Sequence, residues 1–160
     1  VPARNSMLHL NNCMKMLETI KPDGGTRTAD TLHQIADAIH RRAMVVLFSD
    51  LLDESDDVIK ALAHFRKQHH DMIVFHVLDP VELDLNFKRG AEFEDLESGE
   101  KLVVDPRAIA DAYRELFGEF IDGYRKACAE MRIDYRLASP QAPLDTFVRA
   151  YLEERKRMSR

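Results

Sequence analysis

The chain has 160 residues, a length that fits one domain, and an ordinary globular composition with 45% hydrophobic and 32% charged residues. Its net charge of −5 disfavours nucleic acid as a partner, because phosphate binding requires a concentrated basic surface. No apolar run approaches the roughly 18 residues typical of a membrane span, so we expect no membrane segment in this chain. The two cysteines, Cys13 and Cys128, lie far apart in helix-like patterns. This arrangement favours small buried side chains in a reducing, cytoplasmic compartment over a disulfide or a zinc site.

The first part of the chain predicts two amphipathic helices. Residues 6–20 form the first, with Asn5 or Ser6 as its N-cap. Its apolar residues fall on one face: Met7, Leu10, Met14 and Leu17. The segment "KPDGGT" then breaks the pattern, and a second helix is expected from about Thr28 to Arg41. Its apolar stripe consists of Leu32, Ile35, Ala36 and Ile39.

The middle of the chain alternates strands with helices. "AMVVLFS", residues 43–49, is apolar and β-branched, which predicts a strand covered on both faces. A helix is expected from about Asp56 to His69, with Ser55 as its cap and acidic residues in its first turn. "DMIVFHVLD", residues 71–79, predicts a second buried strand. This order is typical of an α/β protein with a parallel sheet.

The last part adds a hairpin and completes the alternation. "AEFEDLESGEKLVVD" predicts a β-hairpin, about 92–96 with 101–104, as an insertion over residues 91–105. A long helix is expected from Pro106 to about Met131, since proline suits the first helical position. "IDYRLAS" is a third strand candidate, and Pro143 opens a final helix to about Arg157. We expect one α/β domain over residues 1–160.

Polar residues follow the ends of these predicted strands. The first strand ends in Ser49 and Asp50, the second in Asp79 and the third in Ser139. Ligands of open α/β sheets bind at the carboxyl ends of strands, and we expect Thr26 of the "DGGT" loop to face Asp50 there. Hydroxyl and carboxylate oxygens suit Mg²⁺. The alternative, that Thr26 is only a turn or cap residue and Asp50 only a strand-end cap, stays open.

Other chemistries find less support in the sequence. There is no Walker A loop and no Gly-x-Gly-x-x-Gly, so nothing indicates nucleotide binding. A triad could be composed from Ser49, His76 and Asp79, but no Gly-x-Ser-x-Gly elbow accompanies it. The seven histidines form no evident ligand set. We expect His33 to lie on a helix surface and His64 near a helix end, where positive charge is favourable.

The sequence also resembles a known family. "GGT" before an amphipathic helix, followed by "VVLFSDLLDE", looks like the second and third metal-site motifs of von Willebrand factor type A domains. More specifically, "HVLDPVE" after the second strand and the "FEDLESGE" hairpin before "VVDP" resemble the bacterial family called domain of unknown function 58. The resemblance covers nearly the whole chain. It implies a partial doubly wound, Rossmann-like parallel sheet with flanking helices, and assigns Thr26, Ser49 and Asp50 to a metal-ion-dependent adhesion site.

One part of the family pattern is missing. The first motif, Asp-x-Ser-x-Ser, has no match, because "DESDD" at residues 53–57 departs from it and follows the wrong strand. The resemblance therefore implies that this chain is the C-terminal part of a longer type A-like domain, holding the last three strands. The edge of strand 43–48 would then be bare. We expect another copy, a swapped segment or the N-terminal helix to cover it.

The resemblance implies a protein–protein interaction module rather than an enzyme. Its site would take Mg²⁺ or Mn²⁺, with weak or absent affinity while the first motif is lacking. Family members are often encoded beside MoxR-type AAA+ ATPases, so such an ATPase is the implied partner, by association only. The alternative is a Mg²⁺-dependent hydrolase or phosphatase in which Asp50 and Asp79 share a cation. A nucleophile or base near the metal would distinguish the two, and the sequence offers none beyond Asp50.

Overall fold

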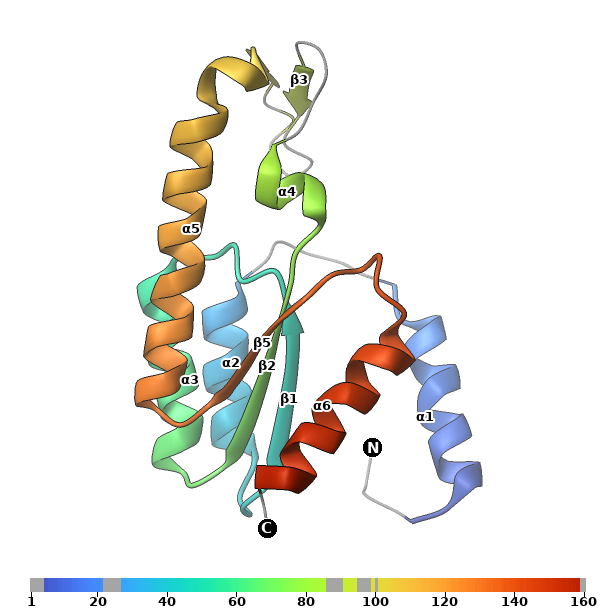
Figure 1. The fold of residues 1–160 in the computed structure, drawn as a ribbon. Coiled ribbons are helices and arrows are strands. Elements are labelled where there is room, and N and C mark those ends of the chain that lie inside the picture. Colours follow the sequence, from blue (N-terminus) through green and yellow to red (C-terminus); the bar gives the residue numbers. More distant parts are fainter. Residues whose placement is uncertain (1–4, 22–26, 86–90, 95–98, 100, 159–160) are drawn as a thin grey trace.

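The structure, a computed structural model, describes residues 5–21, 27–85, 91–94, 99 and 101–158. It is a mixed α/β fold (Figure 1). In chain order its elements are α1 (Met7–Thr19), α2 (Thr28–Ala38), β1 (Met44–Ser49), α3 (Ser55–Lys67), β2 (Asp71–Val77), α4 (Pro80–Asp84), β3 (Ala91–Glu94), β4 (Lys101–Val104), α5 (Pro106–Glu130), β5 (Asp134–Ala138) and α6 (Leu144–Met158).

Three parallel strands form the central sheet, in the order β1-β2-β5. Helices α2, α3 and α5 pack on one face, and α6 packs on the other (Figure 1). The predicted α/β fold with a parallel sheet is therefore confirmed. The predicted hairpin is also present as β3 paired antiparallel with β4. Residues 95–96, which we assigned to its first strand, lie outside the described residues.

Strand β1 is not covered on both faces, so that prediction is wrong. Its side chains alternate between partly buried and exposed. Val45 and Leu47 pack on the main core, whereas Met44, Val46 and Phe48 on the other face are 58%, 44% and 53% exposed. The apolar run was a poor guide because a strand at the end of a sheet has fewer neighbours, and α6 covers only the face of β2 and β5.

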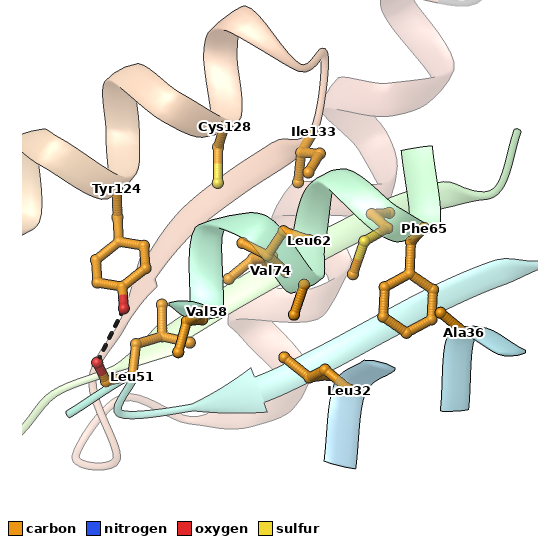
Figure 2. Packing of buried hydrophobic residues seen from close by; sticks show 12 residues of the cluster. Leu32, Ala36, Leu51, Val58, Leu62, Phe65, Val74, Tyr124, Cys128 and Ile133 are labelled. Atoms are coloured by element: carbon orange, nitrogen blue, oxygen red, sulfur yellow. Dashed lines mark hydrogen bonds between the residues drawn. The ribbon is translucent and has the colours of Figure 1, made fainter. Parts of the chain in front are cut away.

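The main core lies between β1, β2 and helices α2, α3 and α5 (Figure 2). Leu62 and Phe65 of α3 are fully buried there, as are Tyr124 and Cys128 of α5. Burying each such apolar side chain stabilises the fold by about 1.5–3 kcal/mol. Burial also raises the pKa of the Cys128 thiol to about 12, so this cysteine is an unreactive core residue, as predicted.

Helix ends follow the sequence signals in most places. The Ser6 hydroxyl accepts the N–H of His9 and caps α1, and the Asp105 carboxylate accepts the N–H of Arg107 and caps α5. Helix α2 ends at Ala38, earlier than the predicted Arg41. Ser55 is the first residue of α3 and not its cap; the N-cap is Glu54, which makes no side-chain capping bond.

Helix α1 has the predicted amphipathic pattern but buries none of its residues. Its apolar side chains are exposed: Met7, Leu8, Leu10, Met14, Met16 and Leu17. Of the three coverings that we expected for the edge of β1, the N-terminal helix is therefore not the one found here, and another copy or a swapped segment stays a prediction. None of the helices in the described ranges is long and apolar enough to cross a membrane.

Candidate functional site

The predicted site residues lie where the parallel strands end. Ser49 is the last residue of β1, Asp50 follows it directly, and Asp79 comes two residues after β2. Because β1 and β2 are parallel neighbours, their carboxyl ends meet at the same edge of the sheet. Ser139 follows the end of β5 at this edge as well. Thr26 lies outside the described residues, so its position opposite Asp50 stays a prediction.

Ser49 and Asp50 form a small hydrogen-bonded turn. The Ser49 hydroxyl accepts the N–H of Leu51 at 3.1 Å and lies 3.5 Å from Asp50 Oδ1. Asp50 Oδ1 also accepts the N–H of Leu52, in a long bond of 3.4 Å. The Asp50 side chain is exposed, and no described residue bonds its Oδ2 atom. One carboxylate oxygen thus faces solvent at the sheet edge, as a cation ligand would.

Buried side chains form hydrogen bonds that support the backbone of this turn. His76 of β2 donates from Nε2 to the Asp50 carbonyl at 2.8 Å and accepts the Tyr135 hydroxyl at Nδ1, at 2.6 Å. The Tyr124 hydroxyl donates to the Leu51 carbonyl at 3.2 Å (Figure 2). Leu51 is fully buried with φ 54°, a left-handed conformation that costs a side-chain-bearing residue on the order of 1 kcal/mol. The neighbouring hydrogen bonds and burial offset that cost.

The protonation states of these groups follow from their surroundings. Burial is the largest cause that lowers the pKa of His76, so the ring is neutral at pH 7 and has one donor and one acceptor nitrogen. Burial also raises the pKa of the Tyr124 and Tyr135 phenols, so both keep their protons and donate. His76 is fully bonded through its two nitrogens, and a Ser49–His76–Asp79 triad is therefore not assembled.

His76, Tyr124 and Tyr135 support the turn, and no sequence motif predicted that role. The contacts span 26 residues or more along the chain, which no local pattern reveals. The sequence did contain a weaker signal for it. His76 lies two residues after Val74 and four after Met72, and such positions in a strand share one face, here the face of β2 that packs against α5.

The acidic segment after Asp50 has a structural role. Asp53 Oδ2 accepts the N–H of Thr28 at 2.6 Å, so the loop after β1 satisfies the first turn of α2. Asp56 and Asp57 lie in the first turn of α3, where negative charge is favourable. The "DESDD" segment thus supports two helix starts, which agrees with its interpretation as a helix start. Asp53 therefore joins the start of α2 to the loop after β1.

Asp79 is explained by local structure. Its Oδ1 accepts the N–H of Val81 at 2.8 Å, and Glu82 Oε2 accepts the N–H of Asp79 at 2.7 Å. This reciprocal capping box begins the short helix α4, which we did not predict although Asp79-Pro80-Val81-Glu82 has the required spacing. A capping carboxylate is less available to a metal ion than the one at Asp50.

The described part of the edge fits Mg²⁺ only in part. Asp50 supplies one open carboxylate oxygen, but the Ser49 hydroxyl already accepts a backbone N–H. Within the described ranges, no three His, Cys, Asp or Glu side chains are grouped to hold a metal ion. Mg²⁺ usually takes one or two protein carboxylates and keeps several waters. These oxygen ligands are therefore compatible with weak Mg²⁺ binding but too few for tight binding.

Comparison with known proteins identifies a family. The sequence model of the family described as Protein of unknown function DUF58 matches residues 1–121, which is more than half of the chain. The match runs from α1 into α5 and includes Ser49, Asp50 and Asp79. No curated protein and no solved structure was found to match. The chain belongs to the DUF58 family, whose function is unknown.

Proposed function

We propose that this chain is a non-enzymatic protein–protein interaction module with a partial metal-ion-dependent adhesion site. The observation that carries the proposal is the exposed Asp50 carboxylate at the carboxyl edge of a parallel sheet. Its turn is held by buried His76 and Tyr124, which fixes the backbone while leaving the carboxylate open. An exposed acid on a rigid loop is suited to binding and gains little for stability.

The proposed site consists of Thr26, Ser49 and Asp50. Bound Mg²⁺ or Mn²⁺ would supply a positive charge with free coordination positions, which a carboxylate of the partner protein would fill. The described residues hold Asp50 in place and leave Oδ2 open to the ion. Because so few protein oxygens are present, we expect weak affinity, and a partner carboxylate would contribute a large share of the coordination.

The partner that we propose is a MoxR-type AAA+ ATPase, with both proteins in the cytoplasm. This part of the proposal rests on the family resemblance. Binding of a purified MoxR-type ATPase, lost on Asp50→Ala and on chelation of divalent ions, would support it. Binding that is unchanged in both cases would refute a metal-bridged contact.

The free edge of β1 provides a second interaction surface. Among the described strands β1 pairs only with β2, and Met44–Ser49 contains no charged residue and no proline to protect its edge. We propose that this edge, residues 43–48, pairs with a second copy of the chain or with a swapped segment. Light scattering over a concentration series would test this, and a mass that stays monomeric would refute it.

The hydrolase alternative receives less support from the geometry. It requires Asp79 as a metal ligand, but Asp79 caps α4 through the capping box with Glu82. A phosphatase assay with Mg²⁺ would distinguish the two proposals. Turnover that Asp50→Ala abolishes would favour the hydrolase and overturn the non-enzymatic module.

The decisive experiment is a calorimetric titration of Mg²⁺ and Mn²⁺ into the chain. We expect a dissociation constant of about 1 mM, with no binding to Asp50→Ala. Asp56→Ala is the matched control, since Asp56 is an exposed acid of the same segment, in the first turn of α3. Equal affinity in the Asp50 variant, or no binding to the wild type, would overturn the metal site.

A further inference from the structure

Two apolar surfaces of the described chain remain exposed to solvent. The first is the face of β1 formed by Met44, Val46 and Phe48, each about half exposed. The second is helix α1, which stands apart from the sheet and buries none of its residues (Figure 1). Large exposed apolar patches commonly mark protein–protein contacts. The metal site proposed at Asp50 uses neither surface.

Helix α1 has the pattern of a helix that packs on another surface. Four exposed side chains lie on one of its faces at helical spacing: Met7, Leu10, Met14 and Leu17. An isolated helix of 13 residues is marginal in water, because most helical stability in proteins comes from packing of an amphipathic face. Helix α1 therefore requires a surface to pack on, and the described part of its own chain buries none of it.

The open face of β1 has the length and the environment that such a helix needs. The six residues of β1 extend for about 20 Å, at about 3.3 Å per residue. The 13 residues of α1 also extend for about 20 Å, at about 1.5 Å per residue. Helices normally cover both faces of a parallel sheet, and on this face α6 covers only β2 and β5. The position beside α6 and above β1 is therefore suited to a further helix.

A hollow extends this face beyond Phe48. It has a volume of about 390 Å³ and lies between the ends of β2 and β5 and the start of α6. Its lining is largely apolar and includes Phe48, Val77, Ala138 and Phe147. Methionine fills irregular apolar gaps well because its side chain is unbranched and flexible, and α1 contains three methionines. The composition of α1 thus suits a face that has a hollow at one end.

We infer that two copies of the chain exchange these helices, so that α1 of each copy packs on the β1 face of the other. A large apolar residue has about 200 Å² of surface, so the four residues of α1 and the three of β1, at 44% to 72% exposed, present about 800 Å² in each copy. Two copies would bury about 1,600 Å² in total, which is the size of a standard stable interface.

The exchange buries apolar surface and no charge. The four apolar residues of α1 and the strand Met44–Ser49 include no charged side chain, so the contact avoids the cost of taking unpaired charges out of water. Each copy presents both surfaces, and exchange of identical elements is a low-cost route to a dimer. The inference rests on the proposed use of β1 for contact between copies. It concerns the face of the strand rather than its edge, and it names the segment that covers this face.

Cys13 provides a reporter for this contact. It lies in the middle of α1, three residues after Leu10 and four before Leu17, and hence beside the apolar face. We expected Cys13 to be buried, but it is only partly buried. Val46 lies in the middle of β1, so the exchanged dimer brings these two positions together. Cys128 is buried and does not compete.

The first test is a cross-link. Val46→Cys places a thiol on the exposed face of β1, and oxidised glutathione then joins thiols that meet. We expect a covalent dimer linked between Cys13 of one copy and position 46 of the other, identified by mass spectrometry of its peptides. Cys13→Ser in the same background is the control and should remove the link.

The second test is the mass of the reduced wild-type chain in solution. Interfaces of this size have micromolar to picomolar dissociation constants, so sedimentation velocity should show a dimer at about 50 µM. Met14→Glu should raise the dissociation constant at least about tenfold, since it would bury a carboxylate without a partner. This variant should still fold, because Met14 is exposed in the single copy. Asn12→Glu places the same charge on the opposite side of α1 and should dimerise as the wild type does.

The other outcomes would overturn the exchange. A chain that stays monomeric would do so, and an internal disulfide between Cys13 and position 46 would show that α1 covers β1 of its own chain. A link between two introduced cysteines would mean that the β1 faces meet directly. A dimer that Met14→Glu leaves equally stable would keep the pairing of β1 edges and remove the helix exchange. The Mg²⁺ titration measures the Asp50 site separately, so either proposal can fail alone.

Discussion

Strands β1 and β2 are adjacent, parallel and almost equally apolar, yet they have different environments. The five central residues of β2 are buried, and the residue at each of its ends is partly buried. Strand β1 alternates, with Met44, Val46 and Phe48 on an exposed face. An apolar composition therefore shows that a strand can be buried, whereas the position of the strand in the sheet determines how much of it is buried.

The two strands also end differently. After β2 the chain passes directly into α4, and Asp79 is occupied as a cap. After β1 the chain makes a turn through the left-handed residue Leu51, and Asp50 remains exposed. The exposed Asp50 carboxylate thus lies beside the strand that has an exposed face and, among the described strands, one unpaired edge. Both features of β1 motivate the binding surface that we propose.

The largest expected effect compares the paired residues Phe75 of β2 and Phe48 of β1, whose rings stack at 4.8 Å. Phe75 also contacts Phe147 and Tyr151 of α6 and is 3% exposed. We expect Phe75→Ala to lower the free energy of unfolding by about 3–5 kcal/mol. Phe48→Ala should lower it by about 1 kcal/mol, mainly through the lost ring pair. Urea denaturation measures both, and equal losses would mean that β1 is as well covered as β2.

The next prediction concerns how stability depends on pH through His76, which links the ends of β1 and β2. Because burial lowers the pKa of His76, the unfolded chain binds a proton at this residue at a higher pH than the folded chain does. The stability that the neutral His76 ring contributes to the fold is complete above the unfolded pKa of about 6.5. It is lost as the pH falls below that value, by up to about 1.4 kcal/mol per pH unit. His76→Gln should remove this slope between pH 6.5 and 5, and also cost about 1–3 kcal/mol at pH 7.5 through the lost Tyr135 bond.

The control for the pH experiment is His40→Gln, since His40 is exposed. This variant should keep the pH dependence of the wild type. If His76→Gln kept it too, the acid sensitivity would come from other groups, and the neutral state that we assign to His76 would be wrong. Unfolding curves at four or five pH values are sufficient for the comparison.

The sequence predicted β2 and α5 well because their signals are local. An apolar run between polar ends marks β2, and Asp105-Pro106 marks the start of α5. The open face of β1 could not be predicted in the same way, since it depends on where α6 packs. The support of Asp50 by His76 was equally hidden, because it joins two strand ends through a tertiary contact. Helix α4 was missed although its capping box is visible in the sequence.

A smaller effect should distinguish the two strand-end carboxylates. Asp79→Ala removes a capping box and should cost about 1–2 kcal/mol of the free energy of unfolding. Asp50→Ala removes two long contacts of an exposed side chain, at 3.4 Å from the Leu52 N–H and 3.5 Å from the Ser49 hydroxyl, and should cost less than about 0.5 kcal/mol. Urea denaturation without added metal measures both. A cost at Asp50 equal to that at Asp79 would mean that Asp50 is a structural cap, and the case for a functional carboxylate would fail.

The smallest expected change in stability is at Val46, in the middle of the exposed face of β1. Its side chain is 44% exposed, so Val46→Lys should change the free energy of unfolding by no more than about 0.5 kcal/mol. Lysine is also a residue that protects strand edges from pairing. If β1 pairs with another copy, light scattering should show that Val46→Lys shifts the wild-type mass toward the monomer. Val74→Lys, at a fully buried position of β2, should instead prevent folding. A stable Val74→Lys protein, or a Val46→Lys protein that unfolds, would reverse the assignment of covered and open strands.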